Sequence, residues 1–395
     1  MRWPFTRRNM KPPDLLADDR AFAPEIRFTF KLFRELAARY SSANIFFSPS
    51  SVMLCLTIVY DGATEETRSD MANALQLSGL DFAGVDGVVS RLRSVAEEQD
   101  AGVRLLVSNS LWCSLRIRVD PAFRARTHEV YDAEVFEVDF AAGHVADKIN
   151  AWVSEKTDGK IARMVDSLDR LTLLVALNAI YFKGIWKQPF QRSWTRDRPF
   201  TTGLGKQKIV PLMLQRGRFR YFEQRDFQAV VLPYQGARMA MYVFLPAAKS
   251  NLKKVHELLS AAAWEEWTKK FASTLGSVHL PRFKMNYEAS LKTALTALGM
   301  ASAFDPKRAE FGRIHDGPPP IWLDEILHRA VAEVNEEGTE AAAVTMTVMR
   351  ALSATRREPP EPEFEIIVNR PFLFLIRDEA SGNILFMGSL VDPTS

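Results

Sequence analysis

Histidine is the residue of this chain best suited to metal binding or to acid–base chemistry near neutral pH. A zinc site of the His-Glu-x-x-His type needs a second histidine four residues after the first, and neither His128 nor His256 has one. The sequence also lacks the Gly-x-Ser-x-Gly turn and the glycine-rich phosphate loop. We therefore expect no metal, no cofactor and no enzyme activity, although a triad built from distant residues stays open. The histidines are His128, His144, His256, His279, His315 and His328.

The segment 336–365 is the other chemically unusual stretch, since it begins acidic, continues with small residues and ends rich in proline. Gly338 can adopt a positive φ that other residues avoid. At the period of a strand, the following residues form one face of threonine and alanine and a second face that includes Val344. Small and β-branched residues allow a strand to fit between two others without overpacking. The residues in question are Glu336, Glu337, Gly338, Thr339, Glu340, Ala341, Ala342, Ala343, Val344 and Thr345.

The composition of this segment is also compatible with two other structures. Alanine is the best helix former, so an alanine-rich helix fits the same residues, and so does a disordered linker. Loops of this length inside a compact fold are usually either functional or disordered. The residues alone leave these alternatives open.

The elements before the segment can be predicted from hydrophobic periodicity. Apolar residues recur at spacings of three and four after Pro24, which predicts a helix that begins there. Residues 44–49 break the pattern. Ser50 or Ser51 can then cap a second, largely apolar helix that ends near Gly62.

The middle and the end of the chain favour strands. The long apolar run 173–186 contains β-branched and aromatic residues, which predicts a strand buried on both faces. Two hairpins are indicated, one pairing 230–233 with 239–245 and the other pairing 372–377 with 384–390. Helices early in the chain and strands later predict an α+β fold.

Composition narrows the class of protein further. The chain has 395 residues, 51 of them basic and 48 acidic, so its net charge of +3 gives no reason to expect nucleic acid or a membrane surface as partner. Cys55 and Cys113 stand in apolar runs and are expected to be buried thiols. We expect residues 1–23 to be a poorly ordered lead-in and residues 24–395 to be a single domain. No signal peptide is recognisable, which favours a cytoplasmic location, and an extracellular one stays open if the start is misassigned.

A series of short motifs, in the same order along the chain, resembles the serpin family of serine protease inhibitors. The resemblance covers about residues 25–393, and the segment 336–345 resembles the hinge of the family's reactive-centre loop. The other motifs are Asn-Ile-Phe-Phe-Ser-Pro-Ser-Ser at 44–51, Asn-Ala-Ile-Tyr-Phe-Lys-Gly-Ile-Trp at 178–186, Leu-Pro-Tyr at 232–234, Leu-Pro-Arg-Phe at 280–283, Leu-Gly-Met at 298–300, Asn-Arg-Pro-Phe at 369–372 and Phe-Met-Gly at 386–388.

The resemblance implies a serpin fold, in which about nine helices surround three β-sheets and a reactive-centre loop, here about 336–365, is exposed above the largest sheet. It also implies a mechanism. A target serine protease cleaves the loop, and the segment that begins at Gly338 inserts into the sheet and traps the acylated protease. The hinge of this movement would comprise residues 337–345. A covalent complex with the protease is the expected partnership, and the protein is expected to be monomeric.

In the family, the cleaved bond typically follows the fifteenth residue counted from the hinge glycine. Counting from Gly338 gives Leu352, so the expected reactive bond is Leu352–Ser353. Leucine suits the apolar primary pocket of a chymotrypsin-like or elastase-like protease. The alternative bond after Arg350 would suit a trypsin-like protease.

The same resemblance assigns a polar cluster beneath the opening sheet and a tryptophan where the loop first enters it. Two residues depart from the usual pattern. Val344 is bulkier than usual in the hinge and is expected to slow insertion, and Asp324 stands where serine is frequent. A non-inhibitory serpin, acting as a carrier or chaperone, is therefore the competing hypothesis, although the hinge is otherwise of the inhibitory type. The assigned residues are Ser48, Ser51, Asn178, Trp186 and His328.

Overall fold

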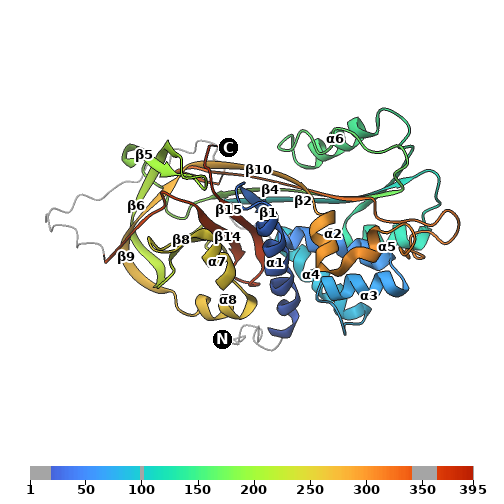
Figure 1. Ribbon diagram of the computed structural model, residues 1–395, viewed down its shortest axis with the longest axis horizontal. Helices are drawn as coiled ribbons and strands as arrows, with labels where there is room; N and C mark the ends of the chain where they lie inside the picture. Colours follow the sequence, from blue (N-terminus) through green and yellow to red (C-terminus); the bar gives the residue numbers. More distant parts are fainter. Residues whose placement is uncertain (1–18, 98–101, 340–362, 395) are drawn as a thin grey trace, which may run out of the picture.

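The computed structural model describes residues 19–97, 102–339 and 363–394, and its helices and sheets are shown in Figure 1. The helices are α1 (Asp19–Arg39), α2 (Pro49–Gly62), α3 (Glu65–Ala74), α4 (Phe82–Glu97), α5 (Pro121–Tyr131), α6 (Val145–Lys156), α7 (Leu252–Leu258), α8 (Ala261–Thr268), and the consecutive segments α9 (Lys292–Leu295), η2 (Thr296–Met300) and α10 (Ala301–Phe304), with a short 3-10 turn η1 (Arg192–Trp194).

The strands belong to two hydrogen-bonded sheets within the described part of the chain. The six-stranded sheet has the order β10 (Phe283–Ser290), β11 (Glu325–Val334), β12 (Gly338–Thr339), β4 (Leu174–Ile185), β2 (Val103–Ser114), β3 (Glu134–Val138). The other sheet has the order β1 (Ile45–Phe47), β15 (Ile384–Leu390), β14 (Phe372–Asp378), β8 (Met239–Pro246), β7 (Phe227–Pro233), β6 (Gln207–Gln224), β9 (Ala272–Pro281), β13 (Phe364–Ile367), with β5 (Arg196–Thr201) beside β6.

Strand β4 is buried on both faces, as its sequence predicts. Val175, Leu177 and Tyr181 pack with α6 on one face, whereas Leu174 and Ala176 pack with α2 on the other. Figure 1 shows α6 and α2 on opposite sides of this sheet. The side chains of successive strand residues point to opposite faces, so a strand covered on both sides must be apolar throughout. Both predicted hairpins are also present, as β7 with β8 and β14 with β15.

Strands β11 and β4 form the central pair of the six-stranded sheet. They pair directly and in parallel from Glu325 opposite Val175 to Val331 opposite Tyr181. We call the end at Glu325 and Val175 the lower end of the pair, and the opposite end, near Val334 and Ile185, the upper end or top. At the upper end, the two residues of β12 lie between them and run antiparallel to both. The sheet is therefore closed along most of this pair and open only at the top. We call the line between β11 and β4 the seam.

Helix α2 ends at Gly62 as predicted, but its predicted cap was wrong. Ser48 is the N-cap, and its hydroxyl accepts a hydrogen bond from the Ser51 backbone N–H, while Pro49 occupies the first helical position. Proline suits this position because its missing N–H has no partner there anyway. The predicted start of α1 was also wrong, since the helix begins at Asp19 and Pro24 lies inside it.

The sheet count differs from the three that the family resemblance implies, because β6 is unusually long. Its first part pairs with β5 and β9, and its last residues pair with β7. The strands β5, β9 and β13 are thus connected through β6 to β7, β8, β14, β15 and β1. Without this connection they would count as two separate sheets. Among the described helices, α9, η2 and α10 follow each other with a kink at Gly299, so counting them once gives nine α-helices, as expected.

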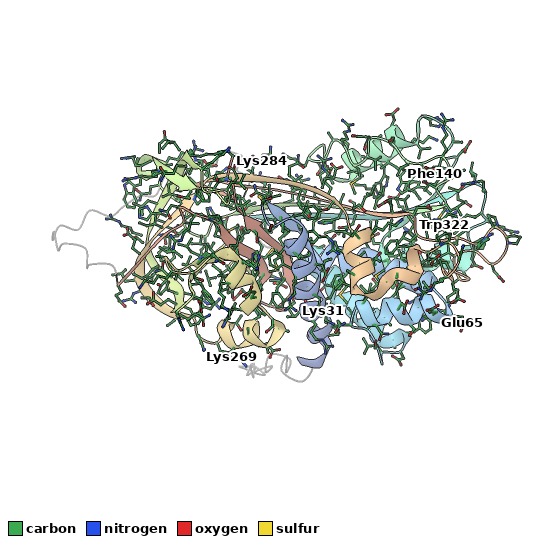
Figure 2. All side chains as sticks on the ribbon, viewed as in Figure 1. Lys31, Glu65, Phe140, Lys269, Lys284 and Trp322 are labelled. Carbon is green, nitrogen blue, oxygen red and sulfur yellow. The ribbon has the colours of Figure 1, made fainter. Side chains whose placement is uncertain are left out.

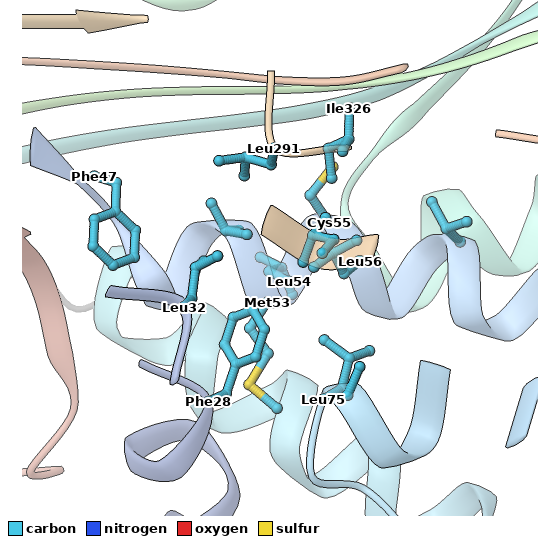
Figure 3. Close-up of a cluster of buried hydrophobic side chains, with 14 of the residues drawn as sticks. Phe28, Leu32, Phe47, Met53, Leu54, Cys55, Leu56, Leu75, Leu291 and Ile326 are labelled. Carbon is cyan, nitrogen blue, oxygen red and sulfur yellow. The ribbon is translucent and has the colours of Figure 1, made fainter. Parts of the chain in front are cut away.

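The largest hydrophobic cluster lies between α2 and the sheets. Phe28 and Leu32 of α1 meet Met53 and Leu56 of α2 there, and Ile326 of β11 reaches the same cluster (Figure 3). Charged side chains such as those of Lys31, Glu65, Lys269 and Lys284 are exposed on the outside (Figure 2). Cys55 and Cys113 are buried and free, in agreement with the sequence.

Candidate functional site

The hinge begins with a tight reversal of the chain at the top of the seam. The Asn335 side-chain oxygen accepts hydrogen bonds from the backbone N–H groups of Glu337 (3.0 Å) and Gly338 (3.3 Å), and the Asn335 N–H donates to the Gly338 carbonyl (2.8 Å). Asparagine side chains commonly stabilise turns by such local bonds. The turn sends the chain back between β11 and β4, where Thr339 lies opposite Val334 on one side and Gly184 on the other.

Glycine is required at position 338. Its φ is +155°, and a Cβ at this position would lie 1.9 Å from the Gly184 carbonyl oxygen and 2.6 Å from the Ile185 Cα. Both neighbours are backbone atoms of β4 that cannot move aside cheaply. The chain can therefore enter the seam at this point only because residue 338 has no side chain.

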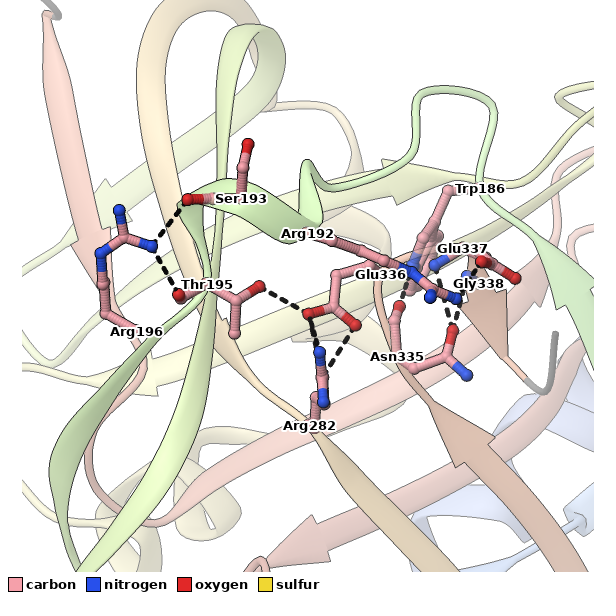
Figure 4. A network of polar contacts seen from close by, with 10 residues as sticks. All are labelled: Trp186, Arg192, Ser193, Thr195, Arg196, Arg282, Asn335, Glu336, Glu337 and Gly338. Atoms are coloured by element: carbon pink, nitrogen blue, oxygen red, sulfur yellow. Dashed lines mark hydrogen bonds and ion pairs between the residues drawn. The ribbon is translucent and has the colours of Figure 1, made fainter. Parts of the chain in front are cut away.

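The carboxylate of Glu336 is buried beside the turn, with 3% of the residue exposed. It accepts hydrogen bonds from Arg282, including one of 2.7 Å from Nε, and one of 2.5 Å from the Thr195 hydroxyl (Figure 4). Burial alone would raise the pKa of Glu336, but the bonds from Arg282 and Thr195 outweigh it and the pKa is lowered. Glu336 is thus charged at neutral pH and ties the hinge to the residues just before β10 and β5.

Removing this carboxylate should loosen the hinge. For E336A we expect the free energy of unfolding to fall by about 2 kcal/mol, because hydrogen bonds to a buried charged group are lost. The matched control is E333A, since the Glu333–Lys284 pair is exposed and 3.9 Å apart, and its loss should cost at most about 0.5 kcal/mol. Urea unfolding measures both. Equal losses in the two variants would contradict the role given to Glu336.

Trp186, just after β4, and Tyr234, just after β7, pair with each other and hold the hinge. The Trp186 backbone N–H donates to the Glu337 carbonyl (2.8 Å), and its ring N–H donates to the Asn335 carbonyl (2.9 Å). The two rings stack with centroids 4.5 Å apart, and the Tyr234 hydroxyl lies 2.8 Å from that of Thr339. Thr339 is fully buried. The first hinge side chain therefore already occupies a place inside the sheet.

Lower along the seam, four of the predicted cluster residues meet in one buried network. His328 of β11 bonds to the Asn178 side-chain oxygen on β4 (2.6 Å), and its other ring nitrogen accepts the Ser48 N–H (3.2 Å). The Asn178 amide donates to the Ser51 hydroxyl (2.5 Å) and to Asn109 of β2 (2.6 Å). All five are at most 5% exposed. The network joins β11, β4, β2 and the start of α2.

His328 is neutral in this network, and its tautomer is fixed by its partners. Nε2 accepts a hydrogen bond from a backbone N–H, so the proton must be on Nδ1, which donates to Asn178. Burial lowers the pKa of His328 to about 3, because a charged ring would lose its hydration there. A proton on Nε2 would break the bond from Ser48.

This geometry predicts that acid weakens the closed sheet. The folded-state pKa of His328 lies below its unfolded value of 6.5, so its contribution to stability is complete above pH 6.5 and is lost as the pH falls toward 3. His256, whose pKa burial lowers to about 4, acts in the same direction. For H328Q we expect the slope of unfolding free energy against pH, between pH 6 and 5, to fall by up to about 1.4 kcal/mol per unit.

Urea unfolding at several pH values gives these slopes. H256Q serves as the control at a histidine away from the seam, and it should remove a similar share while leaving the His328 network intact. An H328Q slope equal to that of the unsubstituted protein would refute the neutral, buried state of His328.

Trp186, predicted with this cluster, lies apart from it. It follows the end of β4, eight residues beyond Asn178, which is about 26 Å along a strand. It belongs to the hinge contacts instead, through its bonds to Asn335 and Glu337.

Asp324, the second departure from the family pattern, joins the two seam strands at the bottom. Its carboxylate accepts the backbone N–H groups of Leu173 (2.7 Å) and Leu174 (3.0 Å), and its other oxygen accepts the Trp322 ring N–H (2.8 Å). A serine hydroxyl could not accept all three bonds in this arrangement. The lower end of the seam is thus held together by the side chain of the residue that directly precedes β11.

The sequence did not identify every residue of the site. Asn109, Thr195, Tyr234, Arg282 and Asn335 were missed, and Asn109 stands between two serines, so no local pattern distinguished it. Arg282 and Tyr234 stood in recognised motifs without a role. The predicted hinge residues Glu337, Gly338 and Thr339 are placed as described. The other predicted positions lie outside the described residues, namely Glu340, Ala341, Ala342, Ala343, Val344, Thr345, Arg350, Leu352 and Ser353.

Across residues 19–97, 102–339 and 363–394, no three histidine, cysteine, aspartate or glutamate side chains are grouped so that they could hold a metal ion. Within the same ranges, no helix has the length and hydrophobicity needed to span a membrane.

Comparison with known proteins agrees with the geometry. The family model described as Serpin (serine protease inhibitor) matches residues 24–393. The leukocyte elastase inhibitor of Bos taurus is 34% identical over 383 residues, which is 94% of this chain and 99% of that protein. A serpin-like protein of Thermococcus kodakarensis is 35% identical over 368 residues, covering 93% of this chain and 84% of that one.

Solved structures agree as well. Native protease nexin-1 with heparin superposes with a TM-score of 0.84 at 28% identity and covers 94% of this chain and all of its own. The thermophilic serpin tengpin in its native state has a TM-score of 0.85 at 24% identity and covers 95% of each chain, which supports the fold alone. The chain therefore belongs to the serpin family of serine protease inhibitors, and it is not an enzyme.

Proposed function

We propose that this protein traps a serine protease as a suicide substrate cleaved at Leu352–Ser353. The protease serine oxygen attacks the Leu352 carbonyl carbon, the bond to the Ser353 nitrogen breaks, and that nitrogen leaves as an amine after taking a proton. The segment from Gly338 to Leu352 stays joined to the protease as an ester. It then inserts into the seam before water can hydrolyse the ester.

The observation that carries this proposal is the position of β12. Gly338 and Thr339 already pair with β4 as the first residues of an antiparallel strand, and the side chain of Thr339 is already buried. Continued insertion would extend an existing strand, so it would avoid the cost of nucleating a new one.

The register of β12 predicts where each inserted residue would lie. Thr339 is opposite Gly184, so each further loop residue moves one step down β4. Ala341 would face Phe182, and Thr345 would face Asn178 of the polar network. Directly opposed residues in an antiparallel pair share a face, so this alternating set would point toward α2.

The other set would point toward α6. There Glu340 would lie opposite Lys183, as a cross-strand pair of opposite charge. Val344 would lie opposite Ala179, whose small side chain leaves room for the bulkier valine. The same face assignment is expected from the sequence, and it supports slower insertion through Val344 without blocking it.

Insertion replaces weaker pairing by stronger pairing. The direct parallel contact of β11 and β4 covers seven residue pairs, and it would give way to two antiparallel ladders, one on each side of the new strand. About ten additional hydrogen bonds at about 1 kcal/mol each would favour the inserted state by on the order of 10 kcal/mol. Such a difference makes the closed sheet metastable with respect to the cleaved one.

The target class follows from Leu352. An apolar residue before the cleaved bond suits a chymotrypsin-like or elastase-like pocket, and the relative from Bos taurus is named a leukocyte elastase inhibitor. Arg350 offers the competing assignment to a trypsin-like protease.

The test is a titration of the purified protein with chymotrypsin, leukocyte elastase and trypsin. We expect a band at the summed mass on denaturing gels and a released fragment that begins at Ser353 by mass spectrometry. A fragment beginning at Ala351 would transfer the bond to Arg350. Complete cleavage without any stable complex, and without a gain in thermal stability, would favour the carrier or chaperone function instead.

A further inference from the structure

A cavity lies directly behind the hinge, next to the segment that follows β4. Its volume is about 460 Å³, which is in the range of small-molecule sites, and it is open to solvent on one side. Its apolar wall is formed by three different parts of the chain. They contribute Trp186 and Phe190, Phe219 of β6, and Leu232 and Pro233 of β7.

The mouth of this cavity is cationic. Lys187 and Arg218 line it and are exposed, and neither has a carboxylate within 4.0 Å among the described residues. Arg216, two residues before Arg218 on β6, is exposed as well and adds a third positive charge nearby. Two acidic residues lie at the start of the hinge, and both are already paired: Glu336 with Arg282, and Glu337 with Arg192.

The polar part of the wall offers neutral hydrogen-bonding groups. The side-chain amide of Gln215 donates to the backbone carbonyl of Gln188, and the side-chain amide of Gln188 donates to the backbone carbonyl of Arg216 (3.4 Å). These bonds hold the walls together and leave the charge at the mouth unbalanced. An apolar interior beneath a cationic rim fits a ligand that has an apolar body and one negative end.

The cavity shares its wall with the hinge. The backbone N–H groups of Trp186 and Phe190 donate to the carbonyls of Glu337 and Glu336, each at 2.8 Å. The segment 186–190 therefore contacts the cavity with its side chains and the hinge with its backbone. Filling the cavity would hold this segment, and with it the hinge, in the present arrangement.

We propose that this cavity binds a small apolar carboxylate, with its apolar body against Trp186, Phe190 and Phe219 and its carboxylate between Lys187 and Arg218. Bound ligand stabilises the hinge and delays the movement of the loop into the seam. The binding site stands on the cavity and its charges, whereas the effect on the loop rests on the proposed function.

Isothermal titration calorimetry of the intact, uncleaved protein tests the binding. The probes are decanoate and 1-naphthoate, which separate an aliphatic from an aromatic ligand, and decanol as the uncharged match. We expect one site, weaker binding of decanol, and a loss of affinity of at least about tenfold in R218E and in K187E. R198E is the matched control, because Arg198 is exposed on β5 and does not line the cavity; it should bind as the unsubstituted protein does.

Unchanged affinity in both R218E and K187E, with thermal melting showing that they are folded, would overturn the proposal, and so would binding of decanol as tight as that of decanoate. The coupling is measured separately, by hydrogen exchange of residues 335–339. At ten times the dissociation constant, exchange should slow by about tenfold if hinge opening requires release of the ligand. This readout needs no protease, so failure of the proposed inhibition and failure of the site give different results.

Discussion

T339R should abolish trapping while leaving cleavage of the loop intact. Thr339 is fully buried, and its hydroxyl contacts that of Tyr234. In T339R the first hinge residues can leave the seam before cleavage, whereas insertion would have to bury the guanidinium without a charged partner, at a cost of several kcal/mol. Since each 1.4 kcal/mol is a factor of ten in rate, insertion should slow by at least about a hundredfold. Hydrolysis of the ester then becomes faster than insertion, and the protein is consumed as a substrate.

Denaturing gels with chymotrypsin give the readout, together with thermal melting of the cleaved product. T339S is the matched control, because it keeps the hydroxyl at the same position and should trap protease as the unsubstituted protein does. The intact T339R must melt cooperatively and be cleaved at the normal rate, so that a folding defect is not mistaken for failed insertion. A normal yield of covalent complex from T339R would refute insertion at this position.

L352D should abolish recognition of chymotrypsin while leaving insertion intact. A carboxylate in an apolar primary pocket loses its hydration and finds no partner, which lowers the association rate by at least about a thousandfold. The loop itself remains competent. Cleavage by trypsin at a neighbouring arginine should therefore still raise the melting temperature of the variant.

S353A is the control for this second prediction, since it changes the other side of the same bond without altering the residue that enters the pocket. If L352D inhibits chymotrypsin normally and R350D abolishes inhibition of trypsin, the reactive bond lies after Arg350. T339R and L352D thus test insertion and recognition separately.

The elements themselves could be predicted largely from the sequence. The run 173–186 could be identified as a doubly buried strand because it lacks polar alternation, and the hairpins because turn residues separate apolar runs. The cap of α2 was misplaced because residues 48, 50 and 51 are all serines, and only the geometry of Pro49 decides among them. A count of sheets could not be predicted, since it depends on which strands pair with one long strand along its length.

The site could be predicted only in part. Ser48, Ser51, Asn178 and His328 were found through the family resemblance, whereas their separation along the chain hides the contacts from any local pattern. Asn109 completes the network but lies in an otherwise ordinary strand. That Thr339 already lies between β11 and β4 in the intact chain could not be foreseen either, because it depends on the space between two strands that are far apart in sequence.

The side chain of Asp324 has a consequence for the final position of a captured protease. It joins the lower ends of β11 and β4. When the two strands separate, the gap between them would therefore end at Asp324. In the proposed inserted state, the register that sets Thr339 opposite Gly184 would bring Met349 opposite Leu174, at the first residue of β4. Leu352 would then lie three residues further, outside the sheet. The attached protease would therefore be carried about 44 Å from the site of entry, to the opposite end of the sheet. Only residues 350–352 would then connect it to the inserted strand, so it would be held close against the molecule.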